Sequence, residues 1–418
     1  MVAVTVTATV FTACNAGDEY IVEPQQDAVY SQTRSSLSVD FTDPQGTFVV
    51  CEGNMTTVNG TVIYYDRDGV EYKDIFEQVN GGAEIGNVVQ DMYIANDRLY
   101  FLTQNGNSQG GLGRLVVCDA HTMQVLGVSD LNDIQTPEGV NTWPQHLIVT
   151  NTTQAFIQYS DVNMESTSGI AEIELVDKGD AGARFVQTVD GTFGEFASAG
   201  ATKARMVYSR GKLYAGCGHS VVIIDPLSPN SIEKRISFED QQVKGVVKGA
   251  DNNIYFALTG RFTGDISAPT FLSRPQMVCM DHSGNVLKKV DMPEDIQLSV
   301  ASWCPAINMC ASFTEPYIFF VDTDDFSYTR AARYNYNTDT FDPDYIPGDQ
   351  TIYGIMGQHP TTKVLWVGKS NYITTDIYQY DVTNTATEVG HFYYGAQKYA
   401  SPAGIDFAYR FTDAYINR

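Results

Sequence analysis

The sequence predicts an all-β protein, a seven-bladed β-propeller in which blade 1 is closed by strands from both ends of the chain. Three observations support this fold class. A short strand phrase recurs seven times, a pair of strands precedes several copies, and the two ends of the chain hold complementary parts of one repeat. No long stretch keeps apolar residues at helical spacing, which excludes a helical bundle.

The recurring phrase is a run of strand-forming residues that ends in an acidic residue and is followed by a turn. The carboxylate can accept hydrogen bonds from backbone N–H groups two residues on and so close an Asx-type turn. The intervals average about 52 residues, and four-stranded units of about 40–60 residues are typical of propeller blades. The copies are 62–66, 115–119, 170–174, 221–225, 277–281, 318–322 and 377–381, the third ending in Glu174 in place of Asp.

A second pattern precedes several copies of the phrase. It is an amphipathic strand, a polar turn and an aromatic strand, as in 90–101, 203–214, 246–256 and 354–366. These two strands, the phrase itself and a returning strand make four strands per unit.

The two ends of the chain complete each other. The first repeat begins at Gly46 without an inner strand, and residues 402–407 look like an inner strand without partners. One blade built from both ends ties the ring shut and removes its open edges. A β-sandwich beside a second domain is the alternative, but it does not explain the recurring phrase.

The N-terminal residues indicate export. Residues 1–13 are uncharged and have the length of a signal-peptide core, too short to span a bilayer. Small residues directly before Cys14 resemble a lipobox, although no Lys or Arg precedes them and Phe11 stands where Leu is usual. The alternative is an edge strand that ends in a buried Cys. We expect a signal peptide at 1–13, lipidation at Cys14, a lipidated tether over 14–45 and the propeller over 46–418.

The net charge and the pattern of cysteine and histidine residues exclude some classes of binding partner. The net charge of −24 argues against nucleic acid, which requires clustered Lys and Arg. No C-x-x-C pair occurs and no two of the six His share metal-ligand spacing, so we expect no metal. The acidic turns at 322–325 and 335–344 lack the features of a calcium-binding EF-hand loop. Cys304 and Cys310 flank a possible hairpin and could face each other.

The start of the propeller region carries a resemblance to a known family. The segments are GTFVVCEGN (46–54), NGTVIYYD (59–66), IFEQVNG (75–81) and IGNVVQDM (85–92). They resemble the YncE-like propeller lipoproteins of Gram-negative outer membranes, nearest the BtuG-type cobalamin-binding proteins. The resemblance is close over about residues 46–125 and beyond that covers only blade period, Asp-closed strands and terminal closure. Long insertions at 257–275 and 334–349 depart from it.

This resemblance implies a cellular location and a function. It implies a lipid-anchored protein exposed on the outer membrane that captures cobalamin or another corrinoid and passes it to a TonB-dependent transporter. No cofactor is required for that task. Because the insertions would rim a binding face, they leave the identity of the ligand open.

A propeller binds ligands at one end of its channel, where inner-strand starts and inter-strand loops converge. The segments expected on that face are 103–113, 128–145, 158–168, 216–219, 257–275, 367–375 and 392–402. A corrinoid requires stacking area and neutral hydrogen-bonding groups. The candidate ligand-binding residues are Gln90, Gln104, Trp143, Gln145, Tyr159, Arg205, His219, Phe262, Tyr372 and Tyr399. For each of them, lining the channel or packing between blades is the alternative.

Two other functions compete with ligand capture. A propeller lactonase or lyase requires convergent titratable groups or a metal at the channel mouth, and Glu52, His219 and Glu315 are the candidates. No spacing demands that they converge, and no nucleophile elbow, P-loop or dinucleotide fingerprint occurs, so we expect no catalytic residues. A protein-interaction or envelope-assembly propeller would instead expose a broad apolar patch.

Overall fold

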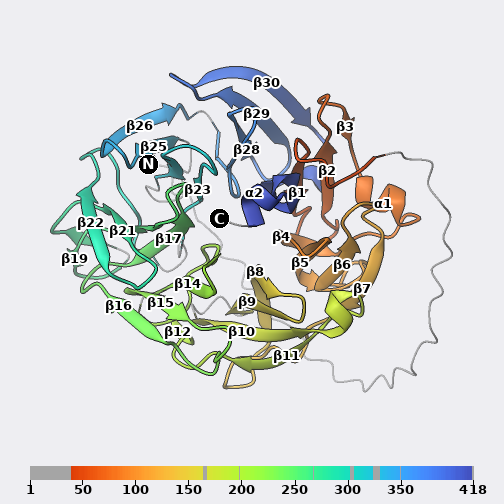
Figure 1. Ribbon diagram of the computed structural model, residues 1–418, viewed down its shortest axis with the longest axis horizontal. Helices are drawn as coiled ribbons and strands as arrows, with labels where there is room; N and C mark the ends of the chain where they lie inside the picture. The colour runs from red at the N-terminus through yellow and green to blue at the C-terminus, as the bar shows by residue number, and fades with distance from the viewer. Residues whose placement is uncertain are drawn as a thin grey trace, which may run out of the picture. The chain divides into compact units, whose positions relative to one another are not determined.

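The computed structural model describes residues 39–416 except 163–166, 197, 267, 302–305, 323–329 and 349. These residues belong to one compact unit. Within them, seven β-sheets of four or five strands follow one another around a central channel, as Figure 1 shows. Each of these sheets is a blade of antiparallel strands, and an eighth sheet is a two-stranded hairpin. The all-β, seven-bladed prediction is confirmed.

The blades share one order of strands from the channel outward. Blade 1 contains β31 (Pro402–Phe407), β1 (Thr47–Cys51), β2 (Thr61–Tyr65) and β3 (Glu71–Tyr72); blade 2 contains β4 (Asn87–Ala95), β5 (Arg98–Gly106), β6 (Leu115–Asp119) and β7 (Val125–Ser129); blade 3 contains β8 (Thr142–Asn151), β9 (Gln154–Asp161), β10 (Thr167–Leu175) and β11 (Ala183–Thr188), with β12 (Gly194–Glu195) beside β10; blade 4 contains β13 (Val207–Ser209), β14 (Lys212–Cys217), β15 (Ser220–Ile224) and β16 (Lys234–Ser237). Blade 5 contains β17 (Val243–Lys248), β18 (Ile254–Leu258), β21 (Gln276–Met280) and β22 (Val286–Asp291), with the hairpin β19 (Phe262–Thr263) and β20 (Thr270–Phe271); blade 6 contains β23 (Met309–Ala311), β24 (Tyr317–Val321), β25 (Ala331–Asn335) and β26 (Thr340–Ile346); blade 7 contains β27 (Gly357–Gln358), β28 (Val364–Ser370), β29 (Thr375–Asp381) and β30 (Thr387–Tyr394).

Helices are few and short in the described residues. They are α1 (Ile75–Val79), α2 (Asp413–Ile416) and the 3-10 turns η1 (Val176–Gly179), η2 (Gln397–Tyr399) and η3 (Ala408–Phe411). None of these helices is long and apolar enough to cross a membrane.

Blade 1 is closed by strands from both ends of the chain, as predicted. The inner strand β31 pairs with β1, with Val49 opposite Ile405. Blade 7 joins the same strand, because Ile355 N donates to Ala403 O and Ile405 N donates to Ile355 O, each at 3.0 Å. The backbones of blades 7 and 1 approach each other closely at Gly354, whose φ of +68° is left-handed. A Cβ atom on this residue would overlap the carbonyl oxygen of Pro402.

The recurring phrase lies on the third strand of every blade except blade 6. There, residues 318–322 lie on the second strand, β24, and the third strand is β25, which ends at Asn335. The acidic turn is built as expected: Asp281 Oδ1 accepts from Ser283 N at 2.9 Å and from Asn285 N at 2.8 Å. Asn335 Oδ1 accepts from Asn337 N at 3.0 Å, so an amide takes the same role in blade 6.

The hydrophobic core lies between neighbouring blades. One cluster joins blades 2 and 3 through residues such as Tyr100, Leu147 and Ile157. Because each blade is covered on both faces, its middle strands are continuous apolar runs with no polar face. The packing begins before Gly46, since Phe41 is buried and its ring centroid lies 5.0 Å from that of Tyr64.

Candidate functional site

A cavity of about 330 Å³ occupies the end of the channel at which the inner strands begin. Each of the seven blades contributes to its lining; one residue from each, in blade order, is Ala403, Gln90, Gln145, Arg205, Val246, Met309 and Ile355. Small-ligand sites typically have volumes of about 300–1,000 Å³. The cavity is therefore at the lower end of that range.

A buried ion pair forms the floor of this cavity. Arg205 precedes β13, and its Nε and Nη2 donate to Asp91 Oδ1 at 3.0 Å and 2.5 Å. Its Nη1 lies 3.6 Å from Asp406 Oδ2. Asp91 is fully buried, which by itself would raise its pKa, but Arg205, His146 and the backbone N–H of Leu147 together hold the pKa below its usual value.

His146 lies beside the same carboxylate. Its Nε2 donates to the Lys203 carbonyl oxygen at 3.1 Å. Its Nδ1 then lies 3.3 Å from Asp91 Oδ2, without the geometry of a hydrogen bond. The imidazole therefore connects blade 3 to the segment that carries Lys203 and Arg205.

Glu52 places a second carboxylate in the cavity wall. It follows β1, where Gln90 Nε2 donates to its Oε1 and the Tyr353 hydroxyl donates to its Oε2, each at 2.8 Å. Burial of the carboxylate raises its pKa to about 7, against the opposing effects of Tyr353, Gln90 and the charge of Lys203. Near neutral pH, this group can therefore hold or release a proton.

Lys203 supplies an amine to the same cavity. Its Nζ lies 5.6 Å from the ring centroid of Phe196. Burial lowers its pKa, although Asp161 and Glu52 favour the charged form.

Tyr372 stands at the rim. It lies in the loop between β28 and β29, where its N–H donates to Ser370 Oγ at 3.0 Å and its φ of +68° turns the chain sharply. The side chain is exposed and meets the Tyr353 ring edge-on, with centroids 5.7 Å apart. It provides an exposed aromatic face at the cavity.

The structure brings four of the ten predicted ligand-binding residues to this cavity: Gln90, Gln145, Arg205 and Tyr372. Gln145 is buried, and its Nε2 donates to Ser160 Oγ at 3.1 Å. Two of the four, Gln90 and Arg205, hold the carboxylates of the cavity, so their amide and guanidinium groups already have protein partners.

The other six lie outside its lining. Tyr159 is fully buried between blades 2 and 3, and its hydroxyl is 2.9 Å from Thr188 Oγ1. Tyr399 packs against Tyr394, with ring centroids 5.3 Å apart. Gln104 is buried within β5, and Trp143 is half-buried at the start of β8, opposite Ser160.

His219 and Phe262 lie on inter-strand connections. His219 forms the turn between β14 and β15, where its Nδ1 donates to the Gln241 carbonyl oxygen at 2.8 Å. Phe262 belongs to the inserted hairpin of blade 5 and faces Phe271, with ring centroids 6.4 Å apart. Blade packing therefore accounts for Tyr159 and Tyr399, and the inserted hairpin accounts for Phe262.

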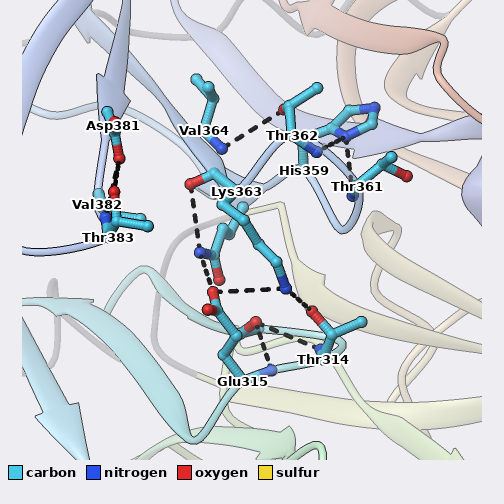
Figure 2. A network of polar contacts seen from close by, with 12 residues as sticks. Thr314, Glu315, His359, Thr361, Thr362, Lys363, Val364, Asp381, Val382 and Thr383 are labelled. Atoms are coloured by element: carbon cyan, nitrogen blue, oxygen red, sulfur yellow. Dashed lines mark hydrogen bonds and ion pairs between the residues drawn. The ribbon is translucent and has the colours of Figure 1, made fainter.

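The three groups considered for an enzyme do not converge. Glu315 lies in the turn after β23, beyond the end of the strand opposite to the cavity. Figure 2 shows it beside Lys363, whose Nζ is 3.8 Å from Glu315 Oε2 and donates to Thr314 Oγ1 at 2.6 Å. His359 fixes the neighbouring turn, since its Nδ1 accepts from the N–H groups of Thr361 and Thr362 at 3.2 Å.

The far end of the channel holds a second, smaller cavity. Its volume is about 130 Å³, and its lining includes the aromatic residues Tyr93, Phe313 and Tyr415 and the charged Arg410. The helix α2, which carries Tyr415, lies near the centre of the ring in Figure 1. Arg205 touches both cavities, so the Asp91–Arg205 layer divides the channel.

No group of three or more His, Cys, Asp or Glu residues in the described part of the chain could hold a metal ion. The acidic turns carry salt bridges instead: Arg330 contacts Asp322 and Asp344, and Arg333 contacts Asp342. Cys304 and Cys14 lie outside the described residues.

Sequence reasoning missed Asp91, His146, Lys203 and Tyr353, and it considered Glu52 only for an enzyme. The signal that could have found them is position. Asp91 and His146 lie within the inner strands β4 and β8, Lys203 and Tyr353 lie in the segments that lead into the inner strands β13 and β27, and Glu52 directly follows β1, the strand beside β31. Once the blade register is known, these positions point to the channel.

Fold and site together define a seven-bladed β-propeller with a polar cavity at one end of its channel. The chain belongs to the DUF5074 family, described as a domain of unknown function, whose model matches residues 45–407. No curated protein matches it.

Solved structures agree on the fold. A quinonprotein alcohol dehydrogenase-like protein from Bacteroides thetaiotaomicron is 18% identical with a TM-score of 0.58, over 89% of this chain and 79% of that chain. The periplasmic gluconolactonase of Pseudomonas aeruginosa is 12% identical with a TM-score of 0.57, over 87% and 98%. A protein from Lactobacillus plantarum is 11% identical with a TM-score of 0.52, over 87% and 99%. At such identities, the likeness concerns the fold alone.

Proposed function

We propose that this chain captures a small molecule in the cavity at the start of its inner strands, without transforming it. The observation that carries the proposal is the convergence of all seven blades on one concave polar space with an aromatic rim. Its walls are held by hydrogen bonds between Glu52, Gln90 and Tyr353, so the cavity is formed before a ligand arrives. Preorganised walls reduce the entropy that binding must offset.

A corrinoid is the first ligand to test, on the strength of the resemblance to BtuG-type proteins. The volume of about 330 Å³ sets how it would bind. A macrocycle would lie across the mouth on Tyr372, with only peripheral amides inside, where Gln145 and Asn308 offer neutral polar groups.

The test is titration of the purified chain with cyanocobalamin, with binding monitored by calorimetry and by absorbance. We expect binding at nanomolar to micromolar concentration and a loss of affinity of about tenfold or more in Tyr372→Ala, because an aromatic anchor is removed. Tyr393→Ala is the matched control, since Tyr393 is an equally exposed tyrosine of blade 7 outside the cavity. Absence of binding at micromolar concentration would exclude the corrinoid.

We further propose that the protein is a lipid-anchored outer-membrane protein that passes its ligand to a TonB-dependent transporter. The support is the run of small residues before Cys14 and the family resemblance. Metabolic labelling with an alkyne fatty acid should mark the wild-type protein and leave Cys14→Ala unmarked. Co-purification of a TonB-dependent transporter with the wild-type protein would support the handover.

One observation favours an enzyme as the second candidate. Glu52, with a pKa of about 7, and Lys203, with a lowered pKa, share one cavity, as an acid–base catalyst requires. Glucono-δ-lactone, suggested by the gluconolactonase of the same fold, is a suitable first substrate. Accelerated hydrolysis in a pH-stat that is lost in Glu52→Gln would establish this candidate against simple capture.

A further inference from the structure

The charged groups at the cavity differ in the partners they hold. Arg205 pairs with Asp91 and Asp406. Glu52 accepts hydrogen bonds from two neutral donors, Gln90 and Tyr353. Lys203 is attracted by the charges of Asp161 and Glu52 but has no hydrogen-bonded partner at its Nζ among the described residues.

Lys203 has no oxygen partner among the residues the structure describes. No hydrogen bond or ion pair reaches its Nζ, and its one close side-chain contact is the Phe196 ring at 5.6 Å. Yet the residue is only partly exposed and lines the cavity. Charged groups inside proteins are normally paired, because an unpaired charge loses its hydration without compensation.

The lowered pKa of Lys203 agrees with this cost, because burial disfavours the charged amine. An anion bound beside Nζ would compensate the charge and raise the pKa again. The missing partner is therefore expected on the ligand.

The number of free charges limits the kind of anion. Lys203 is the one cation of the cavity lining without a hydrogen-bonded partner in the described residues, and the Glu52 carboxylate lines the same space, so a dianion such as a phosphate ester would meet more repulsion than attraction. A carboxylate carries one charge, which one ammonium group can neutralise in a charge-assisted hydrogen bond.

We propose that the cavity binds a ligand bearing a carboxylate group and that Lys203 pairs with this carboxylate. The inference rests on the proposed function and specifies its ligand class. It also separates two kinds of ligand, since a corrinoid fringed with neutral amides does not use an ammonium group in this way.

The experiment compares carboxylates with amides of the same shape. The melting temperature Tm of the full chain is measured against propionate and propionamide, and against benzoate and benzamide, at up to 100 mM and constant ionic strength. We expect at least one carboxylate to raise Tm by about 2 °C at ten times its Kd, while its amide does not. The net charge of −24 disfavours anion binding elsewhere on the molecule.

Two variants assign the effect to Lys203. In Lys203→Met, which keeps the length of the side chain, the difference between carboxylate and amide should vanish. Lys289→Met is the matched control, because Lys289 also lies over a phenyl ring, that of Phe238 at 5.0 Å, but on the outer strand of blade 5. It should keep the difference.

A measurement on the wild-type chain covers the case in which Lys203→Met does not fold. Acetylation of Lys203, quantified by peptide mass spectrometry, should be slowed by the carboxylate and not by its amide. Equal effects of carboxylate and amide, or a difference that persists in folded Lys203→Met, would overturn the proposal. If cyanocobalamin binds while the carboxylates fail, the proposal falls alone and the proposed capture function stands.

Discussion

Arg205 is the residue on which the channel depends, because it contacts Asp91 and Asp406 at the wall between the two cavities. Removal of one partner of a buried ion pair leaves an uncompensated charge and costs about 3–5 kcal/mol. We therefore expect Arg205→Met to lower the free energy of unfolding by that order, measured by urea denaturation. The cost arises at Asp91, because its fully buried carboxylate would lose its positively charged partner.

The matched control is Arg261→Met, at an exposed arginine 3.9 Å from Asp240. Screened surface pairs contribute little, so no measurable change is expected. The double variant Asp91→Asn with Arg205→Met should recover part of the loss. An Arg205→Met protein as stable as the wild type would contradict the importance of the pair.

Glu52 makes stability depend on pH in a defined direction. Its pKa of about 7 in the folded state exceeds the ordinary value of 4.5. Between these pH values the folded protein keeps a proton that the unfolded chain has lost, so the contribution of Glu52 to stability falls as the pH rises through this window. Glu52→Gln, which mimics the protonated acid, should therefore be more stable than the wild type at pH 8 and gain little at pH 4. Urea denaturation of both proteins across this range measures the difference; an equal gain at both ends would contradict it.

Individual residues also show which parts of the site could be predicted from the sequence. Gln90, Gln145 and Arg205, which the sequence predicts as ligand-binding residues, line the cavity because they stand near the starts of inner strands, which converge on the channel. Tyr159 lies on the middle strand β9, which neighbouring blades cover on both faces, so its ring packs between blades 2 and 3 and does not face the channel. Lys203 belongs to no recognisable sequence motif, and its place in the cavity lining becomes visible only in the folded chain.

At the scale of the element, the turn after the third strand of blade 5 is closed by an acidic side chain. The carboxylate of Asp281 accepts two backbone N–H groups and the amide of Asn285 at 2.9 Å. Asp281→Ala should therefore lower the free energy of unfolding by about 1 kcal/mol, because hydrogen bonds to an exposed charged group contribute on that order. Asp281→Asn keeps an acceptor oxygen and should cost less, as Asn335 in blade 6 indicates. Thermal denaturation of both variants distinguishes them; equal losses would contradict a role for the acceptor.

Blade 6 shows why the phrase misleads in one place. Its second strand is also an apolar run that ends in an acidic residue, and there Asp322 binds Arg330. Burial raises the pKa of this carboxyl, although Arg330 opposes the shift. The two roles share one sequence pattern, and only the pairing of strands separates them.

At the scale of the whole molecule, closure of the ring depends on β31. We expect a chain that ends at Ser401 to lose cooperative unfolding, because β1 would become an open edge and Ile355 would lose its hydrogen bonds to Ala403 and Ile405. A chain that ends at Thr412 lacks only α2 and should unfold cooperatively with a modest loss of stability. Circular dichroism on heating and size-exclusion chromatography test both; a cooperative chain ending at Ser401 would contradict the role of the closure.

The fold was predictable at this scale because repetition is visible without loops. The blade period and the complementary ends depend on strands, whose apolar runs are read directly from the sequence. The cavity was predicted only in outline, since its contents depend on how segments before seven different strands meet. Chain segments distant in sequence, such as those of Glu52 and Tyr353, become neighbours only in the closed ring.

Because blade 1 contains strands from both ends of the chain, it can be completed only late in synthesis. Strands β1, β2 and β3 leave the ribosome early, but β31, their inner neighbour, is made last. At 5–20 residues per second, the wait is on the order of tens of seconds. During that time the unpaired edge of β1 can join any other strand, so the growing chain depends on being kept apart from its copies until its final residues emerge.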